Sequence, residues 1–189
     1  MTENQDGLDN YQKFLTQIDE RCAEILADHG SYIVCRRGCD DCCRHISVFA
    51  VEAVAMARAL SRLSRADLAM FRRQAAAAQP DGPCPLLDQG ICRLYAARPI
   101  ICRTHGLPIL ISQNGNTRVD FCPKNFTGLS TLPGNAVLYL ERINETLAAI
   151  NRLFTETHLP DLSPLDRFTV AEVLLLELGD DETGPGEVH

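Results

Sequence analysis

Residues 35–43 read Cys-Arg-Arg-Gly-Cys-Asp-Asp-Cys-Cys, which places four thiols within nine residues of chain. The remaining cysteines are Cys84, Cys92, Cys102 and Cys122, which follow this stretch, and Cys22, which precedes it. The thiolate of a free cysteine is both a nucleophile and a metal ligand, so it oxidises or captures metal. Eight thiols gathered between residues 35 and 122 therefore indicate a shared role, either disulfide bonding or metal ligation.

Whether the cysteines form disulfides or bind metal depends on whether the protein works in an oxidising or a reducing compartment. Its N-terminal residues are polar and acidic, with neither the basic start nor the apolar stretch of a secretory signal. No apolar run approaches the roughly 20 residues that cross a bilayer. We therefore expect a cytoplasmic protein without a membrane segment, in which cysteines stay reduced.

Metal ligation is the predicted role of the eight cysteines that lie between residues 35 and 122. The predicted ligands are Cys35, Cys39, Cys42, Cys43, Cys84, Cys92, Cys102 and Cys122. A disulfide between the neighbours Cys42 and Cys43 would strain their peptide, which disfavours a disulfide framework. A purely redox relay of thiols is the other alternative. Cys22 lies on the apolar face of a predicted helix, where a cysteine acts as a small buried apolar residue.

The distribution of charge supports a metal site rather than a nucleic-acid site. The chain has 189 residues, a net charge of −7 and no Trp. Residues 35–122 nevertheless contain 12 Arg and no Lys against 7 acidic side chains. This local basic excess would offset the charge of bound thiolates, and we expect Arg98 and Arg103 to lie beside the sulfur ligands. The acidic chain as a whole argues against general nucleic-acid binding.

Hydrophobic periodicity predicts several helices. Apolar residues recur at three- and four-residue steps over 8–28, 49–63, 64–78 and 135–158. Ser64 and Asn135 are the predicted N-caps of the last two. Ser163 followed by Pro164 predicts the start of a final helix that ends at Gly179.

Turn signals predict a small β element within the cysteine-rich segment. Asp88-Gln89-Gly90 predicts a tight hairpin between Cys84 and Tyr95, and a helical turn that carries Cys102 follows from Arg98. Asn114-Gly115 is a strong hairpin signal, with strands expected at 107–111 and 117–121.

The predicted fold is therefore mainly α: a helical bundle with a small β-hairpin element inside a cysteine-rich metal-binding centre. We expect a single domain over 1–179, with a cysteine core at 35–122 and flanking helices at 8–28 and 135–178. Residues 180–189 are expected to form a disordered tail. The run at 173–176 is apolar on more than one face of its helix, which predicts deep burial or a homodimer through the C-terminal helix.

Cysteine spacing leaves the metal open between zinc and iron. Cys39-x2-Cys42 resembles half of a zinc knuckle, but the chain has no second short step of that kind. The adjacent Cys42 and Cys43 favour two metal centres, or two irons of one cluster, because neighbouring side chains diverge. A 4Fe–4S cluster accepts such irregular spacing, and two four-cysteine sites would use all eight ligands. His45 and His105 flank the cysteines, and we expect structural hydrogen bonds from them rather than ligation.

The spacing Cys35-x3-Cys39-x2-Cys42 also occurs in radical S-adenosylmethionine enzymes. Those enzymes wrap the motif into a β/α barrel. This chain has neither repeating βα units nor the necessary length, so that identity is disfavoured.

The full pattern resembles a known family. Cys35-x3-Cys39-x2-Cys42-Cys43 is followed by Cys84-Pro-Leu-Leu-x4-Cys92-x2-Tyr95-x2-Arg98-Pro99-x2-Cys102-Arg103-x2-Gly106 and then by Cys122. This is similar to the YkgJ-type cysteine-cluster family, whose domain is described as zinc- or iron-chelating. The resemblance implies a metal-binding domain built around the eight cysteines. A distant relative, the flagellin lysine N-methylase, implies a 4Fe–4S cluster, but this chain shows no flagellin or S-adenosylmethionine site.

Three functions follow as hypotheses. The first is an iron–sulfur protein in electron transfer or redox catalysis, which needs a redox partner. The second is a zinc-binding module with two four-cysteine sites that recruits a protein partner. The third is an enzyme, such as a cluster-dependent methyltransferase, with an open metal position.

Overall fold

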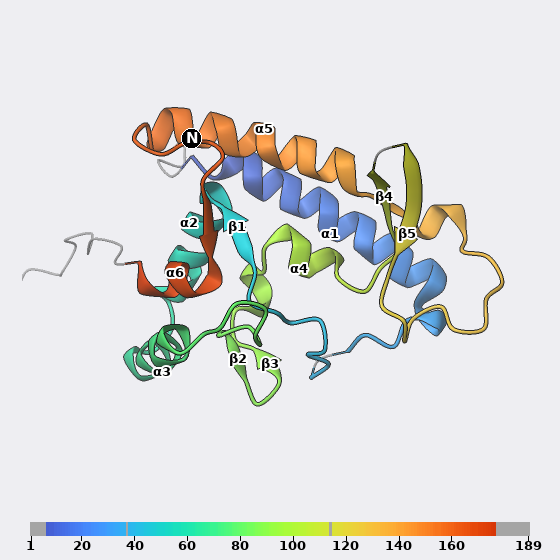
Figure 1. Cartoon of the computed structure of the whole chain (residues 1–189), viewed down its shortest axis with the longest axis horizontal. Coiled ribbons are helices and arrows are strands. Elements are labelled where there is room, and N and C mark those ends of the chain that lie inside the picture. The colour runs from blue at the N-terminus through green and yellow to red at the C-terminus, as the bar shows by residue number, and fades with distance from the viewer. Residues whose placement is uncertain (1–6, 37, 114, 177–189) are drawn as a thin grey trace, which may run out of the picture.

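Two long helices lie side by side and carry much of the core. The structure is a computed structural model, which describes residues 7–36, 38–113 and 115–176. Helix α1 (Asp9–His29) is followed by a 3-10 turn, η1 (Gly30–Tyr32), and α5 (Leu140–His158) packs along α1 (Figure 1). α1 buries Tyr11, Phe14, Ile18, Cys22 and Ile25 at three- and four-residue steps, which confirms the predicted helix and the burial of Cys22.

Three shorter helices form a second apolar cluster. They are α2 (Ala50–Leu60), α3 (Arg65–Ala76) and α6 (Val170–Leu175). Ser64 caps α3, because its hydroxyl accepts the Asp67 N–H at 3.1 Å. Helix α2 joins the two clusters: Val51 faces α1 and α5, whereas Met56 faces α3 and α6.

Short strands lie between these helices and form three small sheets. β1 (Ser47–Phe49) pairs antiparallel with β7 (Arg167–Thr169), and β2 (Leu87–Asp88) pairs with β3 (Ile91–Cys92). β4 (Ile109–Gln113) lies between β5 (Asn116–Asp120), antiparallel to it, and β6 (Leu138–Tyr139), parallel to it. The fold is thus mixed α/β with helices predominating, and the expectation of a plain helical bundle with one β element is too simple.

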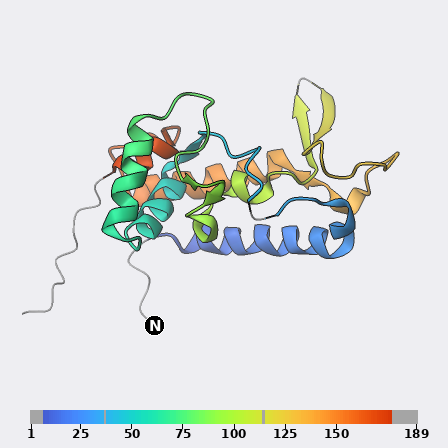
Figure 2. The same ribbon diagram turned by 90° about the horizontal axis from the view of Figure 1, so that it is seen from below.

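The cysteine-rich middle of the chain contains the hairpins expected there. β2 and β3 turn at Gln89-Gly90, and β4 and β5 turn near Gly115. Between the hairpins, a 3-10 turn η2 (Tyr95–Ala97) leads into the short helix α4 (Ile100–Thr104), which carries Cys102. The β4–β5 hairpin stands at one end of the molecule and α3 at the opposite end (Figure 2).

The start predicted for the long helix at Asn135 is wrong. Residues Gly134–Ala136 form a 3-10 turn, η3, and the helix begins only at Leu140, after β6. The side chain of Asn135 instead bonds to the end of α1, with Oδ1 2.9 Å from His29 Nε2 and Nδ2 donating to Asp28 at 3.1 Å. Pairing of Leu138 with β4 holds this segment extended, so Asn135 cannot cap the helix.

The start predicted for the last helix at Ser163 is also wrong. The Ser163 N–H donates to the Asp166 carboxylate at 2.9 Å, which closes a turn before β7. Helix α6 begins at Val170, where Thr169 and Glu172 form a capping box. That Thr-x-x-Glu signal is present in the sequence and outweighs Ser163-Pro164. Residues 177–179 of the predicted helix and the predicted tail 180–189 lie outside the described residues.

The apolar run at 173–176 is only partly buried. Val173 and Leu174 are buried, whereas Leu175 and Leu176 are exposed. Within the described residues, no helix is both long and apolar enough to cross a membrane.

Candidate metal centre

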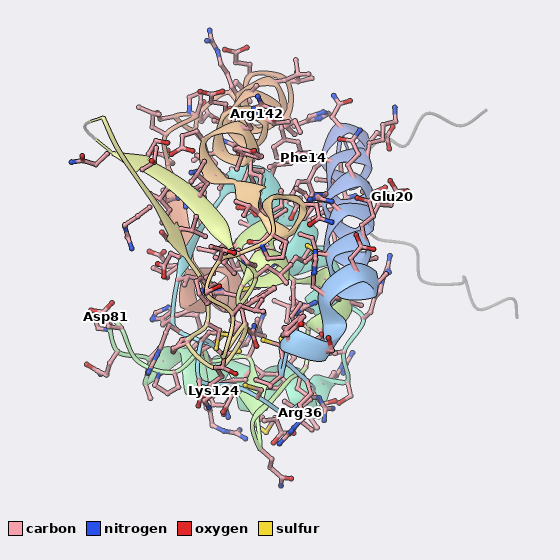
Figure 3. All side chains as sticks on the ribbon, turned by 90° about the vertical axis from the view of Figure 1, so that its right-hand side faces the viewer. Phe14, Glu20, Arg36, Asp81, Lys124 and Arg142 are labelled. Atoms are coloured by element: carbon pink, nitrogen blue, oxygen red, sulfur yellow. The ribbon has the colours of Figure 1, made fainter. Side chains whose placement is uncertain are left out.

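Five separate segments carry the eight predicted ligands, and seven of these ligands line one cavity. The loop between η1 and β1 carries Cys35, Cys39, Cys42 and Cys43, and the other four come from the loop after α3, from β3, from α4 and from the loop after β5. Figure 3 shows sulfur atoms near the labelled Lys124 and Arg36. Their mutual electrostatic effects and contacts divide the eight thiols into two groups of four.

The first quartet consists of Cys35, Cys39, Cys42 and Cys122. Burial raises the pKa of Cys42, and the neighbouring thiols of Cys35, Cys39 and Cys122 raise it further. Gly106, from the loop after α4, lies against this quartet with a φ of +89°. A Cβ at Gly106 would stand 2.7 Å from Cys35 Sγ and 3.7 Å from Cys122 Cβ, so only glycine fits there.

Asn125 contacts the first quartet from outside the cysteine pattern, through Cys35. Its side chain is only 1% exposed. Nδ2 donates to Gly106 O at 2.7 Å and to Cys35 Sγ at 3.3 Å, while Oδ1 accepts the Val34 N–H at 2.9 Å. Sequence reasoning missed this residue, because an asparagine three positions after Cys122 carries no signal of its own.

The second quartet consists of Cys43, Cys84, Cys92 and Cys102. Burial raises the pKa of Cys43 to about 12, and the thiols of Cys42, Cys84 and Cys92 contribute. Burial and the thiols of Cys84, Cys92 and Cys43 likewise raise the pKa of Cys102 to about 12. The Cys84 N–H donates to Cys43 O at 3.0 Å, which joins the first cysteine loop to the segment that leads into β2.

The two quartets adjoin at the peptide between Cys42 and Cys43. The Cys42 thiol acts on the pKa of Cys43, yet its other thiol neighbours all belong to the first quartet. Seven of the eight predicted ligands, all but Cys122, line a cavity of about 340 Å³, and Cys22 lines it too. In the described part of the chain, no three Cys, His, Asp or Glu side chains lie close enough together to hold one ion. The quartets are therefore groups of neighbouring thiols rather than complete metal sites. Their sulfur atoms are the kind of ligand that zinc and iron–sulfur clusters use.

Burial of the thiols has a direct chemical consequence. Because burial and neighbouring thiols raise the pKa of Cys43 and Cys102 to about 12, both are protonated at neutral pH without metal. A metal ion must displace those protons, and binding therefore strengthens as pH rises.

Arg98 and Arg103 fix the backbone around Cys102. Arg98 donates to Tyr95 O at 3.1 Å and to Cys102 O at 3.3 Å, and its guanidinium lies 3.6 Å from the centre of the Tyr95 ring. Its charge partly offsets the effect of burial, which raises the pKa of Cys92 and Cys102.

Arg103 ties the same loop to α1. It donates to Arg98 O at 2.7 Å and to Ala96 O at 2.8 Å, and it forms an ion pair with Asp19 at 2.5 Å. The loop between Cys92 and Cys102 is therefore held mainly by arginine bonds to backbone carbonyls.

The histidines contribute differently. The Ala171 N–H donates to His45 Nε2 at 3.2 Å, and Nδ1 lies 3.2 Å from Gln79 O, so His45 joins α6 to the segment after α3. This is the structural hydrogen bonding expected for it. His105 lies at the wall of the sulfur-lined cavity, where burial lowers its pKa.

Comparison with known proteins gives one match. Residues 34–123 match the model of the CxxCxxCC family, described as a "putative zinc- or iron-chelating domain". The matched segment contains all eight cysteines of the two quartets. No curated protein and no solved structure matches the chain.

Proposed function

Because residues 34–123 of this chain belong to the CxxCxxCC family of zinc- or iron-chelating domains, we propose that the protein carries iron–sulfur clusters of the 4Fe–4S type for redox chemistry. The two quartets would be the ligands. Each offers four thiols, which is the ligand number of a 4Fe–4S cluster.

The size of the sulfur-lined cavity carries this proposal. A cavity of about 340 Å³, lined by seven of the predicted ligands and by Cys22, gives more room than a single metal ion needs. Irregular spacings such as the ten residues from Cys92 to Cys102 also suit a cluster, because its four corners lie apart. A bound cluster would accept and donate single electrons.

The protein's own residues would control that electron exchange. The backbone around Cys102 is pinned by Arg98 and Arg103, so its sulfur would move little when the charge of the centre changes. The Arg98 charge and the Asn125 N–H directed at Cys35 Sγ both favour the more negative, reduced state.

Anaerobic purification from iron-supplied cells tests the proposal. Broad visible absorption with matched iron and acid-labile sulfide is the expected result. Replacement of Cys102 with Ala should remove the metal of the second quartet. The comparison variant is Cys22→Ala. Cys22 lines the same cavity but belongs to neither quartet, so metal content should stay unchanged if only the eight predicted ligands bind metal. A colourless protein with stoichiometric zinc and no sulfide would refute the iron–sulfur proposal.

A zinc-binding module is the second candidate, and the division into two quartets favours it. Two separate groups of four thiolates match the ligand number of two structural zinc sites. The short step from Cys39 to Cys42 is also typical of zinc knuckles. This candidate predicts about two zinc ions per chain, which the same metal analysis measures.

A further inference from the structure

A second cavity lies beside the first quartet. It has a volume of about 550 Å³ and is lined by residues of α4, α5, the β4–β5 hairpin and the β1–β7 sheet. In Figure 1, α4 lies between the β1–β7 strands and the β4–β5 hairpin, with α5 above it. The lining of the cavity includes Cys42 and Cys122 but none of the cysteines of the second quartet. We call this cavity the hairpin cleft. Its volume is typical of sites that bind small molecules.

The walls of the hairpin cleft are largely apolar and only partly covered. They include Phe49, Ile101, Ile111, Phe121, Leu140 and Ile143. Each of these six side chains keeps part of its surface accessible, and Ile101 is 46% exposed. Apolar side chains that converge on one hollow and stay accessible to solvent are typical of a binding site.

The acidic side chains of the cleft are already engaged. Asp41 forms an ion pair with Lys124, and Asp120 forms one with Arg118 at 3.5 Å. Glu52 accepts the backbone N–H groups of Phe49 and Ile100, each at 3.1 Å.

Arg167, by contrast, retains free donors. Its guanidinium lies 4.1 Å from the centre of the Phe49 ring, and Nη2 donates to Ser47 O at 3.1 Å. Over residues 7–36, 38–113 and 115–176, no carboxylate forms an ion pair with it. A guanidinium has five N–H donors, so Arg167 can still bind an anionic group of a ligand.

We propose that the hairpin cleft binds a small organic acid. Its apolar body would lie against the isoleucine, leucine and phenylalanine side chains, and its carboxylate or sulfonate would pair with Arg167. Such a molecule would lie beside Cys42 and Cys122. Only the statement that the ligand lies beside a metal site rests on the proposed metal function. Binding of the ligand itself needs only the cleft and Arg167.

Two fluorescent probes of similar shape test this in the full-length, metal-loaded protein. Anilinonaphthalene sulfonate has an apolar body and one anionic group, whereas phenylnaphthylamine is its neutral counterpart. We expect saturable binding of one anionic probe per chain. Arg167→Gln should weaken the anionic probe about tenfold, the loss of one charge-assisted hydrogen bond, and leave the neutral probe unchanged.

A pair of substitutions on α5 locates the binding. Ile143→Trp fills the cleft and should abolish binding of both probes. Leu153→Trp is the matched control, because Leu153 is 53% exposed on the same helix and does not line the cleft. Arg167 is exposed, so Arg167→Gln should not disturb folding. The test therefore stays valid even if Ile143→Trp disturbs the packing of α5.

Several results would overturn the proposal. They are the absence of saturable binding in protein with full metal content, equal effects of Arg167→Gln on the two probes, or equal losses from Ile143→Trp and Leu153→Trp. Metal analysis of the same samples separates this inference from the proposed function. If anaerobic purification from iron-supplied cells yields protein without metal, the metal proposal is refuted, and saturable binding of the anionic probe to that protein would leave the cleft proposal standing.

Discussion

Asn125 shows how one side chain outside the cysteine pattern orders the predicted ligands. Its amide donates to Cys35 Sγ and to Gly106 O and accepts the Val34 N–H. In Asn125→Asp, a carboxylate oxygen would face that sulfur and that carbonyl, so two attractions would become repulsions. We expect metal affinity at the first quartet to fall 10- to 100-fold, the usual cost of losing a partner of a ligand. Titration with increasing concentrations of a competing chelator measures this metal affinity.

Asn151 supplies the matched control for that substitution. It is 0% exposed, and its amide likewise accepts one backbone N–H, from Val51 at 3.0 Å, and donates to one carbonyl, Pro164 O at 2.9 Å. Asn151→Asp should destabilise the fold by about 1–3 kcal/mol, as for other unsatisfied buried groups, and leave metal affinity unchanged. Equal metal loss in the two variants would show that Asn125 acts only through stability.

Gly106 gives a second prediction at the residue scale. Gly106→Ala combines backbone strain, from a φ of +89°, with a clash between the new Cβ and Cys35 Sγ. Gly128 has a φ of +85° with no heavy atom within 4 Å of the place a Cβ would take, so Gly128→Ala isolates the strain. Gly128→Ala should lose about 1–2 kcal/mol of unfolding free energy in urea titrations, and Gly106→Ala should lose more because of its additional clash. Only Gly106→Ala should also lose metal from the first quartet, and metal retention there would contradict the proposed packing.

Among the elements, the loop from η2 into α4 depends most on its arginines. Arg98→Ala removes two hydrogen bonds to the backbone that carries Cys102, together with a positive charge near the thiols. We expect the second quartet to lose metal affinity 10- to 100-fold and the first quartet to keep its own. Metal analysis of single-quartet variants, each with the other four cysteines replaced by Ala, measures the two affinities separately.

Arg93→Ala is the control for Arg98→Ala. Arg93 follows Cys92 directly, but its ion pairs with Asp67 at 3.4 Å and Asp88 at 3.3 Å are partly exposed. Such pairs contribute at most about 1 kcal/mol. Metal affinity should therefore stay unchanged in Arg93→Ala, and a loss as large as that of Arg98→Ala would point to a general effect of charge.

The elements also show which sequence signals suffice. α1 was predictable because its apolar stripe is long and regular, and α3 because Ser64 and Asp67 cap it locally. Asn135 and Ser163 are equally good caps by residue type, but distant contacts decide their structure. Pairing of Leu138 with β4 and of β7 with β1 keeps both segments extended, and a single sequence contains no local signal for such pairings.

At the scale of the whole molecule, the same distinction applies to the candidate site. The cysteine pattern alone gives the prediction that these eight thiols are ligands, because their number and spacing are local facts; that they bind metal stays a prediction. Their division into two quartets depends on how five segments fold, so it could not be read from spacing. The assignment of Cys42 and Cys43 to different quartets does agree with the divergence expected of neighbouring side chains.

The two quartets adjoin different parts of the core. Leu107 and Phe126, from the segments around the first quartet, belong to the cluster of α1 and α5. Cys84 and Cys92 of the second quartet pack on the cluster of α2, α3 and α6. The peptide between Cys42 and Cys43 would therefore connect metal sites that brace both halves of the core.

Metal removal should for this reason destabilise the whole protein. Metal at a thousand times its dissociation constant stabilises a fold by about 4 kcal/mol per site. For a chain of this size, 1 kcal/mol corresponds to about 2–4 °C. Stripping the zinc-loaded protein with a chelator under reducing conditions should therefore lower the midpoint of thermal unfolding by about 10 °C or more. Calorimetry should also show a broader unfolding transition, because the two apolar clusters of the core are no longer connected through bound metal. Added metal should restore the midpoint and the width of the transition. An unchanged midpoint would mean that neither quartet braces the fold.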